Sequence, residues 1–239
     1  MTEELNQELR AGLTRLGLRP SEQAIEKLNL YCDLLLEKNQ VMNLTAIKDP
    51  SEVVKFHFLD SAALLPTKAL AGKKVIDVGT GAGFPGLVLK ILDPSIELTL
   101  LDTLGKRIEW LQEVSHCLGL EGVTFLKGRA EELSHRPEYR DRYDVAVSRA
   151  LAAMPMLAEL CLPYVKQGGL FFAMKSNKTD EEIQSAEEII AKLGGDKPFV
   201  MDYLVPGTEV YHRLVTVYKS EITPKEYPRK WTKIKEANE

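Results

Sequence analysis

The sequence lacks any apolar run close to the roughly 20 residues that a membrane-spanning helix needs. Cysteine is also scarce: Cys32, Cys117 and Cys161 are scattered, which argues against a disulfide framework and a zinc site. The first residues, MTEELNQELR, are polar and acidic, unlike a secretory signal. We therefore expect a soluble, cytoplasmic protein, monomeric, with no membrane partner and no bound metal.

A net charge of −4 at pH 7 gives no general indication of a nucleic-acid-binding protein. Tyr227 and Trp231 nevertheless lie within a basic C-terminal segment. Cations interleaved with aromatic rings suit contact with phosphates and stacking on bases, although a solvated tail is the simpler interpretation. The cations of this segment are Lys219, Lys225, Arg229, Lys230, Lys233 and Lys235.

Helical patterns fill the first part of the chain. Leucines recur at helical spacing and the pattern stops at Gly17. A second helix is predicted after Ser21, which can cap it. A third is predicted to begin at Asp49-Pro50 and to end near Leu65. No alternating β pattern appears in this part.

From Lys73 onward, short apolar runs alternate with helical stretches. This alternation indicates a doubly wound, Rossmann-like α/β fold with a mostly parallel sheet. The last two runs have no full helix between them, so we expect an antiparallel hairpin at one edge. The seven predicted strands are KVIDV (74–78), ELTLLD (97–102), VTFLKG (123–128), YDVAVSR (143–149), LFFAMKS (170–176), PFVMDYLV (198–205) and HRLVTVYK (212–219).

Three parts of the chain follow from these patterns. Residues 1–70 are expected to form a helical N-terminal extension that packs on the main domain. Residues 71–220 are expected to form the α/β domain, and residues 221–239 a basic C-terminal tail.

The stretch VIDVGTGAGFPG joins the first predicted strand to a helix, and its glycines fit two patterns. The first, G-x-G-x-G, uses Gly79, Gly81 and Gly83 and indicates S-adenosylmethionine. The second, G-x-G-x-x-G, uses Gly81, Gly83 and Gly86 and indicates NAD. Glycine lets a ligand approach the backbone at this edge of the sheet. Asp77, inside the strand, can interact with an ammonium group, which favours S-adenosylmethionine.

Further candidates for the cofactor site follow the second and third strands. Asp102 ends the second strand, and a carboxylate there can accept hydrogen bonds from ribose hydroxyls. Ala130 and Glu131 follow the third strand, where an adenine ring would lie. S-adenosylmethionine and NAD both contain adenosine, so these positions do not distinguish them.

Several blocks, in their order and spacing from about Leu30 to Lys230, resemble one family. These blocks are NLTAI (43–47), HFLDS (57–61), DVGTGAGFPG (77–86), LLDTLGKR (100–107), GRAEE (128–132) and SRA (148–150). They are similar to the bacterial ribosomal RNA small subunit methyltransferase G, or glucose-inhibited division protein B, family. The resemblance implies a class I fold that transfers methyl from S-adenosylmethionine to N7 of a guanosine. The implied partner is 16S ribosomal RNA or the small ribosomal subunit.

The resemblance also implies a set of cofactor contacts, which join Asp77, Gly81 and Gly83 of the turn. The C-terminal sequence YPRKWTKIKEANE keeps the YPRK start of the family tail and lacks its later Gly-Pro segment. The implied cofactor contacts are Gly79, Phe84, Asp102, Thr103, Leu104, Ala130, Glu131 and Arg149.

Guanine N7 carries a lone pair, so methylating it requires orientation and exclusion of water rather than a general base. No strong base stands out, and we assign no catalytic residue. Enzymes that methylate exocyclic amines usually have Asn/Asp-Pro-Pro-aromatic where this chain has Ser148-Arg149-Ala150. Cys161 lies in an apolar helical stretch and is expected in the core, not as a nucleophile.

Three residues are candidates for positioning the substrate. Arg149 could bind guanine O6 or phosphate, or pair with Asp144 or another carboxylate. Asn43 could form a turn through its own side chain or contact a splayed base. Lys175 ends the fifth strand and could contact phosphate.

Two other functions stay open at this stage. An NAD-dependent oxidoreductase would use the second glycine pattern, but no catalytic His–Asp or Tyr–Lys group is identifiable. A non-catalytic module that binds RNA or the ribosome could retain the cofactor pocket. His57, three residues before Asp60 on one helical face, is expected to contact that carboxylate and to hold the N-terminal helices against the sheet.

Overall fold

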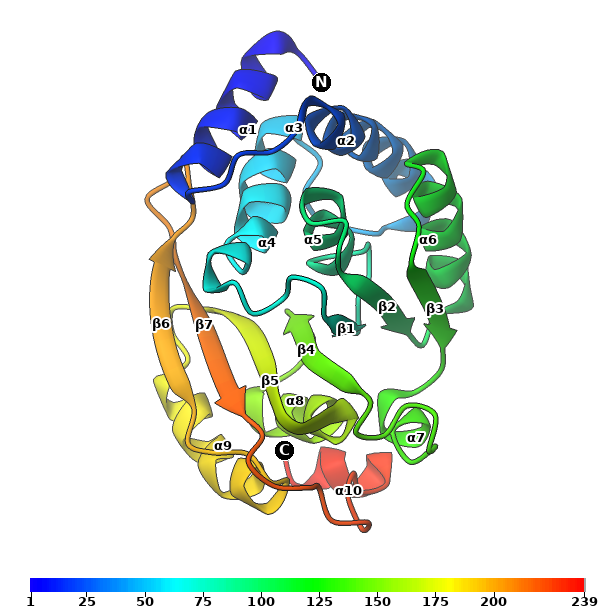
Figure 1. Cartoon of the computed structure of the whole chain (residues 1–239), viewed down its shortest axis with the longest axis vertical. Helices are drawn as coiled ribbons and strands as arrows, with labels where there is room; N and C mark the ends of the chain where they lie inside the picture. Colours follow the sequence, from blue (N-terminus) through cyan, green and yellow to red (C-terminus); the bar gives the residue numbers. More distant parts are fainter. Residues whose placement is uncertain (239) are drawn as a thin grey trace.

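The apolar runs of the second part of the chain form one sheet in the computed structural model, which describes residues 1–238 (Figure 1). All seven predicted strands are present, and the fifth begins five residues earlier than predicted, at Val165. The strands are β1 (Lys74–Val78), β2 (Glu97–Asp102), β3 (Val123–Lys127), β4 (Tyr143–Arg149), β5 (Val165–Ser176), β6 (Phe199–Leu204) and β7 (Tyr211–Tyr218).

The strand order is β3-β2-β1-β4-β5-β7-β6. Strands β1 to β5 are parallel to one another, whereas β7 is antiparallel to both β5 and β6. The prediction of a mostly parallel sheet with an antiparallel edge hairpin is confirmed. The order reverses between β1 and β4, and ligands of doubly wound sheets bind at such a point, beyond the carboxyl ends of the strands.

Helices cover both faces of the sheet. In Figure 1, α1 to α6 lie above it and α7 to α10 below. No helix within residues 1–238 is both long and apolar enough to span a membrane. The helices are α1 (Glu3–Arg15), α2 (Glu22–Met42), α3 (Pro50–Glu52), α4 (Asp60–Ala62), α5 (Gly86–Leu92), α6 (Gly105–Cys117), α7 (Ala130–Leu133), α8 (Met154–Cys161), α9 (Asp180–Lys192) and α10 (Trp231–Glu236).

The N-terminal helices begin where the sequence predicts. The Ser21 hydroxyl accepts a hydrogen bond from the Ala24 amide at 3.1 Å, and Asp49 likewise caps α3. The third predicted helix is less regular than expected, because a π-helical stretch, Val53–Leu59, separates α3 from α4. Such stretches are frequent at functional sites. Apolar periodicity does not distinguish them from α-helix.

One apolar core joins the N-terminal helices to the upper face of the sheet. Leu28 of α2 and Phe58 of the π-helical stretch are fully buried in the same cluster as Leu87 and Leu100. A second core, around α8 and α9, fills the lower face. The helical segment therefore shares its core with the sheet.

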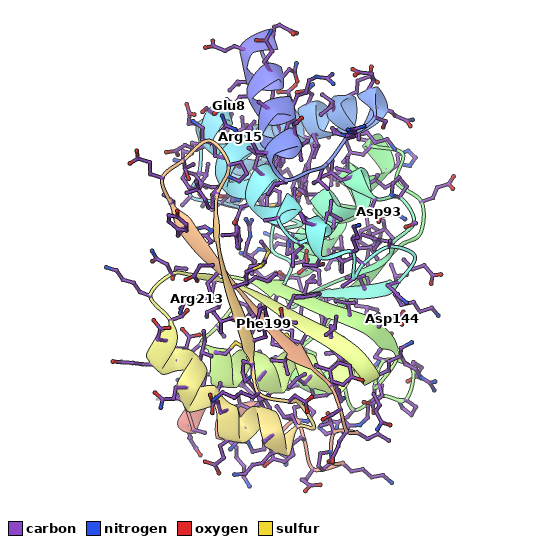
Figure 2. All side chains as sticks on the ribbon, turned by 60° about the vertical axis from the view of Figure 1, so that its left-hand side comes forward. Glu8, Arg15, Asp93, Asp144, Phe199 and Arg213 are labelled. Carbon is purple, nitrogen blue, oxygen red and sulfur yellow. The ribbon has the colours of Figure 1, made fainter. Side chains whose placement is uncertain are left out.

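The turn between β6 and β7 reaches the N-terminal helices from the far edge of the sheet. Figure 2 turns this edge toward the viewer, with Phe199 and Arg213 on the hairpin and Glu8 and Arg15 above it. A Cβ added to Gly207 of this turn would lie 3.6 Å from a carboxyl oxygen of Glu8. The hairpin thus contacts the helical layer as well as the sheet.

Part of the basic C-terminal segment is buried, so the interpretation as a solvated tail does not hold for it. Arg229 contacts the fully buried Glu159, with Nη2 at 2.6 Å from Oε2. Lys219 is also fully buried and ion-pairs with Asp141 at 2.7 Å. Ile234 of α10 has no exposed surface. These contacts fix the segment against the lower face.

Replacing Arg229 with alanine would leave the Glu159 carboxylate buried without its cation. We expect the free energy of unfolding, measured by urea denaturation, to fall by about 3 kcal/mol. The double variant Glu159→Gln with Arg229→Met should recover part of that loss. Arg10→Ala, which removes the exposed ion pair with Glu22, is the control and should change little. Equal losses of unfolding free energy in Arg229→Ala and Arg10→Ala would contradict a larger contribution from the buried pair.

Candidate functional site

The turn between β1 and α5 uses the left-handed conformation repeatedly. The backbone angle φ is +72° at Gly79, +57° at Gly81 and +97° at Gly83. A Cβ at Gly83 would lie 2.6 Å from the Tyr31 hydroxyl and 2.8 Å from a methyl of Leu87, so packing excludes a side chain there. At Gly81 the nearest atom to such a Cβ is 4.0 Å away. The turn therefore offers open, bare backbone to a ligand at Gly81.

Asp77 lies completely buried beneath this turn. Its Oδ2 accepts hydrogen bonds from the Thr80 hydroxyl at 2.7 Å and from the Gly86 amide at 2.9 Å. Burial raises the pKa of this carboxyl to about 6, although both hydrogen bonds oppose the shift. The observed contacts favour a role in bracing the turn. A direct contact with a cofactor stays a prediction.

Asp102 connects the end of β2 to the glycine turn. Its Oδ2 accepts from the Gly81 amide at 3.0 Å, and its Oδ1 from the Leu104 amide at 2.9 Å. Arg107 lies 3.4 Å from the same carboxylate, and Thr103 and Leu104 are exposed beside it. A fixed carboxylate next to open backbone at the edge of the sheet can accept hydrogen bonds from ribose hydroxyls.

The end of β3 adds a second acid to this edge. Glu131 is buried and ion-pairs with Arg129, while Ala130 accepts a hydrogen bond from the Tyr164 hydroxyl at 2.7 Å. The Arg129 guanidinium also lies over the Trp231 ring, 4.7 Å from its centre. The C-terminal helix therefore reaches the end of the site where the sequence predicts an adenine ring.

Arg149, at the end of β4, contacts the π-helical stretch across the sheet edge. Its Nη1 donates to the Phe56 carbonyl oxygen at 2.7 Å and to Asp60 Oδ2 at 2.9 Å. Its guanidinium lies 5.1 Å from the centre of the Phe84 ring. The carboxylate that pairs with it is thus Asp60 and not Asp144. The side chain is still 13% exposed, so a ligand contact stays compatible with this pairing.

His57 joins three of the blocks that the sequence singles out. Its Nε2 lies 2.8 Å from the Thr45 hydroxyl and its Nδ1 3.0 Å from Arg149 Nη2, while its ring stacks on Phe84. A guanidinium only donates, so Nδ1 accepts and the ring proton lies on Nε2. Burial and the neighbouring charge of Arg149 lower the pKa of His57 to about 3. The predicted contact between His57 and Asp60 is not made as a hydrogen bond; both residues bond to Arg149 instead.

Asp60 is almost fully buried and connects α4 to the far strands of the sheet. Its Oδ1 accepts from the Tyr203 hydroxyl at 2.7 Å and lies 2.8 Å from His212 Nδ1. Burial raises the pKa of Asp60, but the hydrogen bond from His212 and the charge of Arg149 outweigh it and hold the pKa below its usual value. The carboxylate is therefore ionised and held from three strands.

A cleft of about 560 Å³ opens beside this network. Apolar side chains and cations share its walls, which suits a base together with its phosphate. The residues lining it are Ile47, Phe56, His57, Asp60, Arg149, Ala150, Met174, Lys175, Ser176, Lys178, Thr179, Glu182 and His212.

Lys175 does not present a free charge to the cleft. Its Nζ donates to the Ala152 carbonyl oxygen at 2.8 Å and pairs with Glu182 at 2.6 Å, leaving the side chain 11% exposed. Lys178, which the sequence analysis did not single out, is exposed on the same cleft and has no ion pair within residues 1–238. Of these two lysines, Lys178 is therefore the one whose side chain is more accessible to a ligand of the cleft.

Asn43 ends α2 in the left-handed conformation, with φ at +47° and ψ at +52°. The side chain that holds the following turn is Asn39, which bonds both the amide and the carbonyl oxygen of Thr45 at 2.9 Å. The backbone of Asn43 thus supports the interpretation as a turn residue. Its exposed side chain leaves a contact with substrate as a prediction.

Two residues of the cleft, His212 and Glu182, are not marked by any pattern in the sequence. His212 lies 152 positions from Asp60, and Glu182 lies 28 positions from the Met154 amide and belongs to a different element from Lys175, so no local pattern marks these contacts. Cys161, in contrast, is confirmed in the core: it is fully buried, and burial raises the pKa of its thiol well above the usual value.

Comparison with known proteins gives matches along most of the chain. The family model described as GidB, rRNA small subunit methyltransferase G, matches residues 24–206. A relative named ribosomal RNA small subunit methyltransferase G, from Alkaliphilus metalliredigens, is 45% identical over 223 residues and covers 93% of each chain. Another of that name, from Alkaliphilus oremlandii, is 46% identical over 228 residues and covers 95% of each chain.

Solved structures match the fold at lower identity. A candidate O-methyltransferase from Klebsiella pneumoniae aligns with a TM-score of 0.54 at 17% identity, covering 80% of this chain and 90% of that one. A predicted O-methyltransferase from Agrobacterium tumefaciens gives 0.52 at 12% identity, over 63% and 75%. These matches support the class I methyltransferase fold. The relatives and the family model go further, and the chain belongs to the rRNA small subunit methyltransferase G family.

Proposed function

We propose that this protein transfers a methyl group from S-adenosylmethionine to N7 of a guanosine in 16S ribosomal RNA. One observation carries the proposal: a cleft lined by apolar and charged side chains adjoins the glycine turn, and its most buried titratable groups, His57 and Asp60, use both ring nitrogens and both carboxylate oxygens on protein partners. Such a site can orient a nucleophile that needs no deprotonation, and guanine N7 is one.

The residues around the glycine turn fit S-adenosylmethionine, which supplies the methyl group when bound. Gly81 offers open backbone, and Asp102 offers a fixed carboxylate for ribose hydroxyls. The third glycine of the NAD pattern serves helix packing, because a Cβ at Gly86 would lie 2.7 Å from Leu100 and 2.8 Å from Asp77 Oδ2. Membership of the methyltransferase family favours the first glycine pattern over the second.

His57 and Asp60 are better suited to positioning than to proton transfer. His57 is neutral at pH 7, but both of its ring nitrogens are engaged. Asp60 is ionised, yet each of its oxygens has a partner. The contribution of the protein to methyl transfer is then orientation of the two reactants and exclusion of water, which can account for several orders of magnitude in rate.

A guanine in the cleft would meet donors from β4 and apolar walls from the N-terminal extension. We propose that Arg149 donates to guanine O6, and that Ile47 and Phe56 face the base. Lys178 would contact the adjoining phosphate. On this proposal, residues 1–70 complete the cleft, which gives the proposed division of the chain into extension, main domain and tail a functional basis.

A wider RNA contact is proposed for the C-terminal segment. Lys219 and Arg229 are used inside the protein, but Lys230 and Lys233 are exposed around Trp231. A tryptophan beside exposed cations can stack on a base while the cations contact phosphates. Since small ribosomal subunits function in the cytoplasm, we propose that location for this protein. A monomeric state stays a prediction.

Label transfer tests the proposed reaction. Purified protein would be incubated with methyl-labelled S-adenosylmethionine and 30S subunits that lack their N7 methylation, and the digested nucleosides would be separated. We expect label in 7-methylguanosine. Label in another nucleoside would reject N7 as the acceptor. If no label is transferred although the cofactor binds, the alternative of a non-catalytic module that binds the ribosome is favoured.

The cofactor site can be tested in the same assay with Asp102→Asn. Loss of the carboxylate removes charge-assisted hydrogen bonds, so the KM for S-adenosylmethionine should rise about 10-fold while the KM for the subunit stays constant. Asp93→Asn, at the end of α5 and away from the turn, is the matched control. An unchanged cofactor KM in Asp102→Asn would remove this residue from the site.

The C-terminal contact predicts a salt-dependent effect. Lys230→Glu with Lys233→Glu should raise the KM for the subunit about 10-fold, and the dependence of log binding on log salt should become shallower by about 0.7 per lost contact. The control, Lys68→Glu with Lys73→Glu, makes the same charge change before β1, near the opposite strand ends. Equal responses of the two double variants would indicate a general charge effect and no contact at α10.

A further inference from the structure

The loop from Ala150 to Ala153 lies between the glycine turn and the cleft. Ala150 lines the cleft. The next residue, Leu151, packs on the glycine turn, where a Cβ added to Gly79 would lie 2.6 Å from Leu151 Cδ1. The Leu151 side chain is also 40% exposed. Leu151 therefore packs on the glycine turn directly after a residue that lines the proposed guanosine cleft.

This loop is held by side chains from two other elements. Lys175 of β5 donates from Nζ to the Ala152 carbonyl oxygen at 2.8 Å. Glu182 of α9 accepts a hydrogen bond from the Met154 amide, just after the loop. Lys175 and Glu182 also pair with each other, with Nζ 2.6 Å from Oε1. We name this pair and its two backbone contacts the Lys175–Glu182 clasp.

The loop requires such support because its own backbone is unfavourable. Ala150 has φ at +53°, a conformation that residues with a Cβ rarely adopt. The clasp itself is anchored to the sheet: Asp180, the first residue of α9, pairs with Arg213 of β7 at 2.6 Å. Figure 2 shows Arg213 on the hairpin, beside the start of this helix. The position of Leu151 is therefore fixed by contacts from β5, through Lys175, and from β7, through Arg213.

We propose that the Lys175–Glu182 clasp is a positioning device for methyl transfer, which fixes Leu151 between donor and acceptor so that the methyl group and the guanine meet at the right distance. The proposal rests on the proposed function, because it concerns the same site. It gives Lys175 a different role from a phosphate contact: this residue acts through the loop and does not touch the RNA. Small errors in the alignment of reactants lower the rate far more than they weaken binding.

The test compares Lys175→Met and Glu182→Gln with variants of a second ion pair, which lies on α9, the helix that carries Glu182. The control pair, Lys192 and Glu188, has the same 2.6 Å separation but is exposed and one turn apart. We expect either clasp variant to lower kcat for methylation of 30S subunits at least 10-fold, with less than a 2-fold change in the KM for the subunit. Lys192→Met and Glu188→Gln should change neither.

Two further measurements separate positioning from stability. Lys175→Arg can still donate to Ala152 and pair with Glu182, so it should restore much of the kcat that Lys175→Met loses. Hydrogen exchange should accelerate at the amides of residues 151–154 in both clasp variants, with unchanged exchange in the β1 and β4 strands. Full kcat with a lowered Tm would overturn the proposal, because the clasp would then be only a structural brace.

Other outcomes have equally definite meanings. A raised KM for the subunit with unchanged kcat in Lys175→Met would overturn the proposal in favour of a phosphate contact. If the wild-type protein transfers no label, the proposed function fails, and the clasp is judged by hydrogen exchange and S-adenosylmethionine affinity alone. Unchanged exchange in the loop together with unchanged affinity would then overturn it; faster exchange with weaker binding would support it.

Discussion

The buried ion pair between Asp60 and Arg149 is the interaction on which the site depends. Removing a carboxylate from water costs several kcal/mol, and here that cost is offset by a guanidinium and by hydrogen bonds from Tyr203 and His212. These partners come from β4, β6 and β7, while Asp60 comes from the helical layer. A single carboxylate thus aligns the N-terminal helices with three strands of the sheet.

The aromatic residues of the site are aligned by the same guanidinium. Arg149 orients the His57 ring, which stacks on Phe84 at 4.3 Å between ring centres, and Phe84 belongs to the glycine turn. Since Arg149 can only donate, the tautomer of His57 is fixed, and so is its bond to Thr45. The conformation of the turn and the shape of the cleft are therefore coupled through one side chain.

Local patterns predict the parts of this protein whose causes are local. The glycine turn and the capping of α2 by Ser21 each depend on residues within a few positions of one another, and each lies where the sequence predicts. Asp102 also lies at the end of β2 as predicted, although it bonds to Gly81, 21 positions away. The partners of Arg149 could not be predicted, because Asp60 lies 89 positions from it and 152 positions from His212. Likewise, Lys175 looks like a free cation until its partner Glu182 is known.

The core that the N-terminal helices share with the upper face of the sheet determines which amino-acid substitutions affect activity. Leu28 and Phe58 belong to the same cluster as Leu87 and Leu100, so a defect in either layer disturbs the other. A cavity or an overpacked side chain in α1 or α2 would shift the helical layer, and with it Asp60 and the cleft wall. Substitutions that abolish activity are therefore expected throughout the helical layer, and not only in the glycine turn and the cleft.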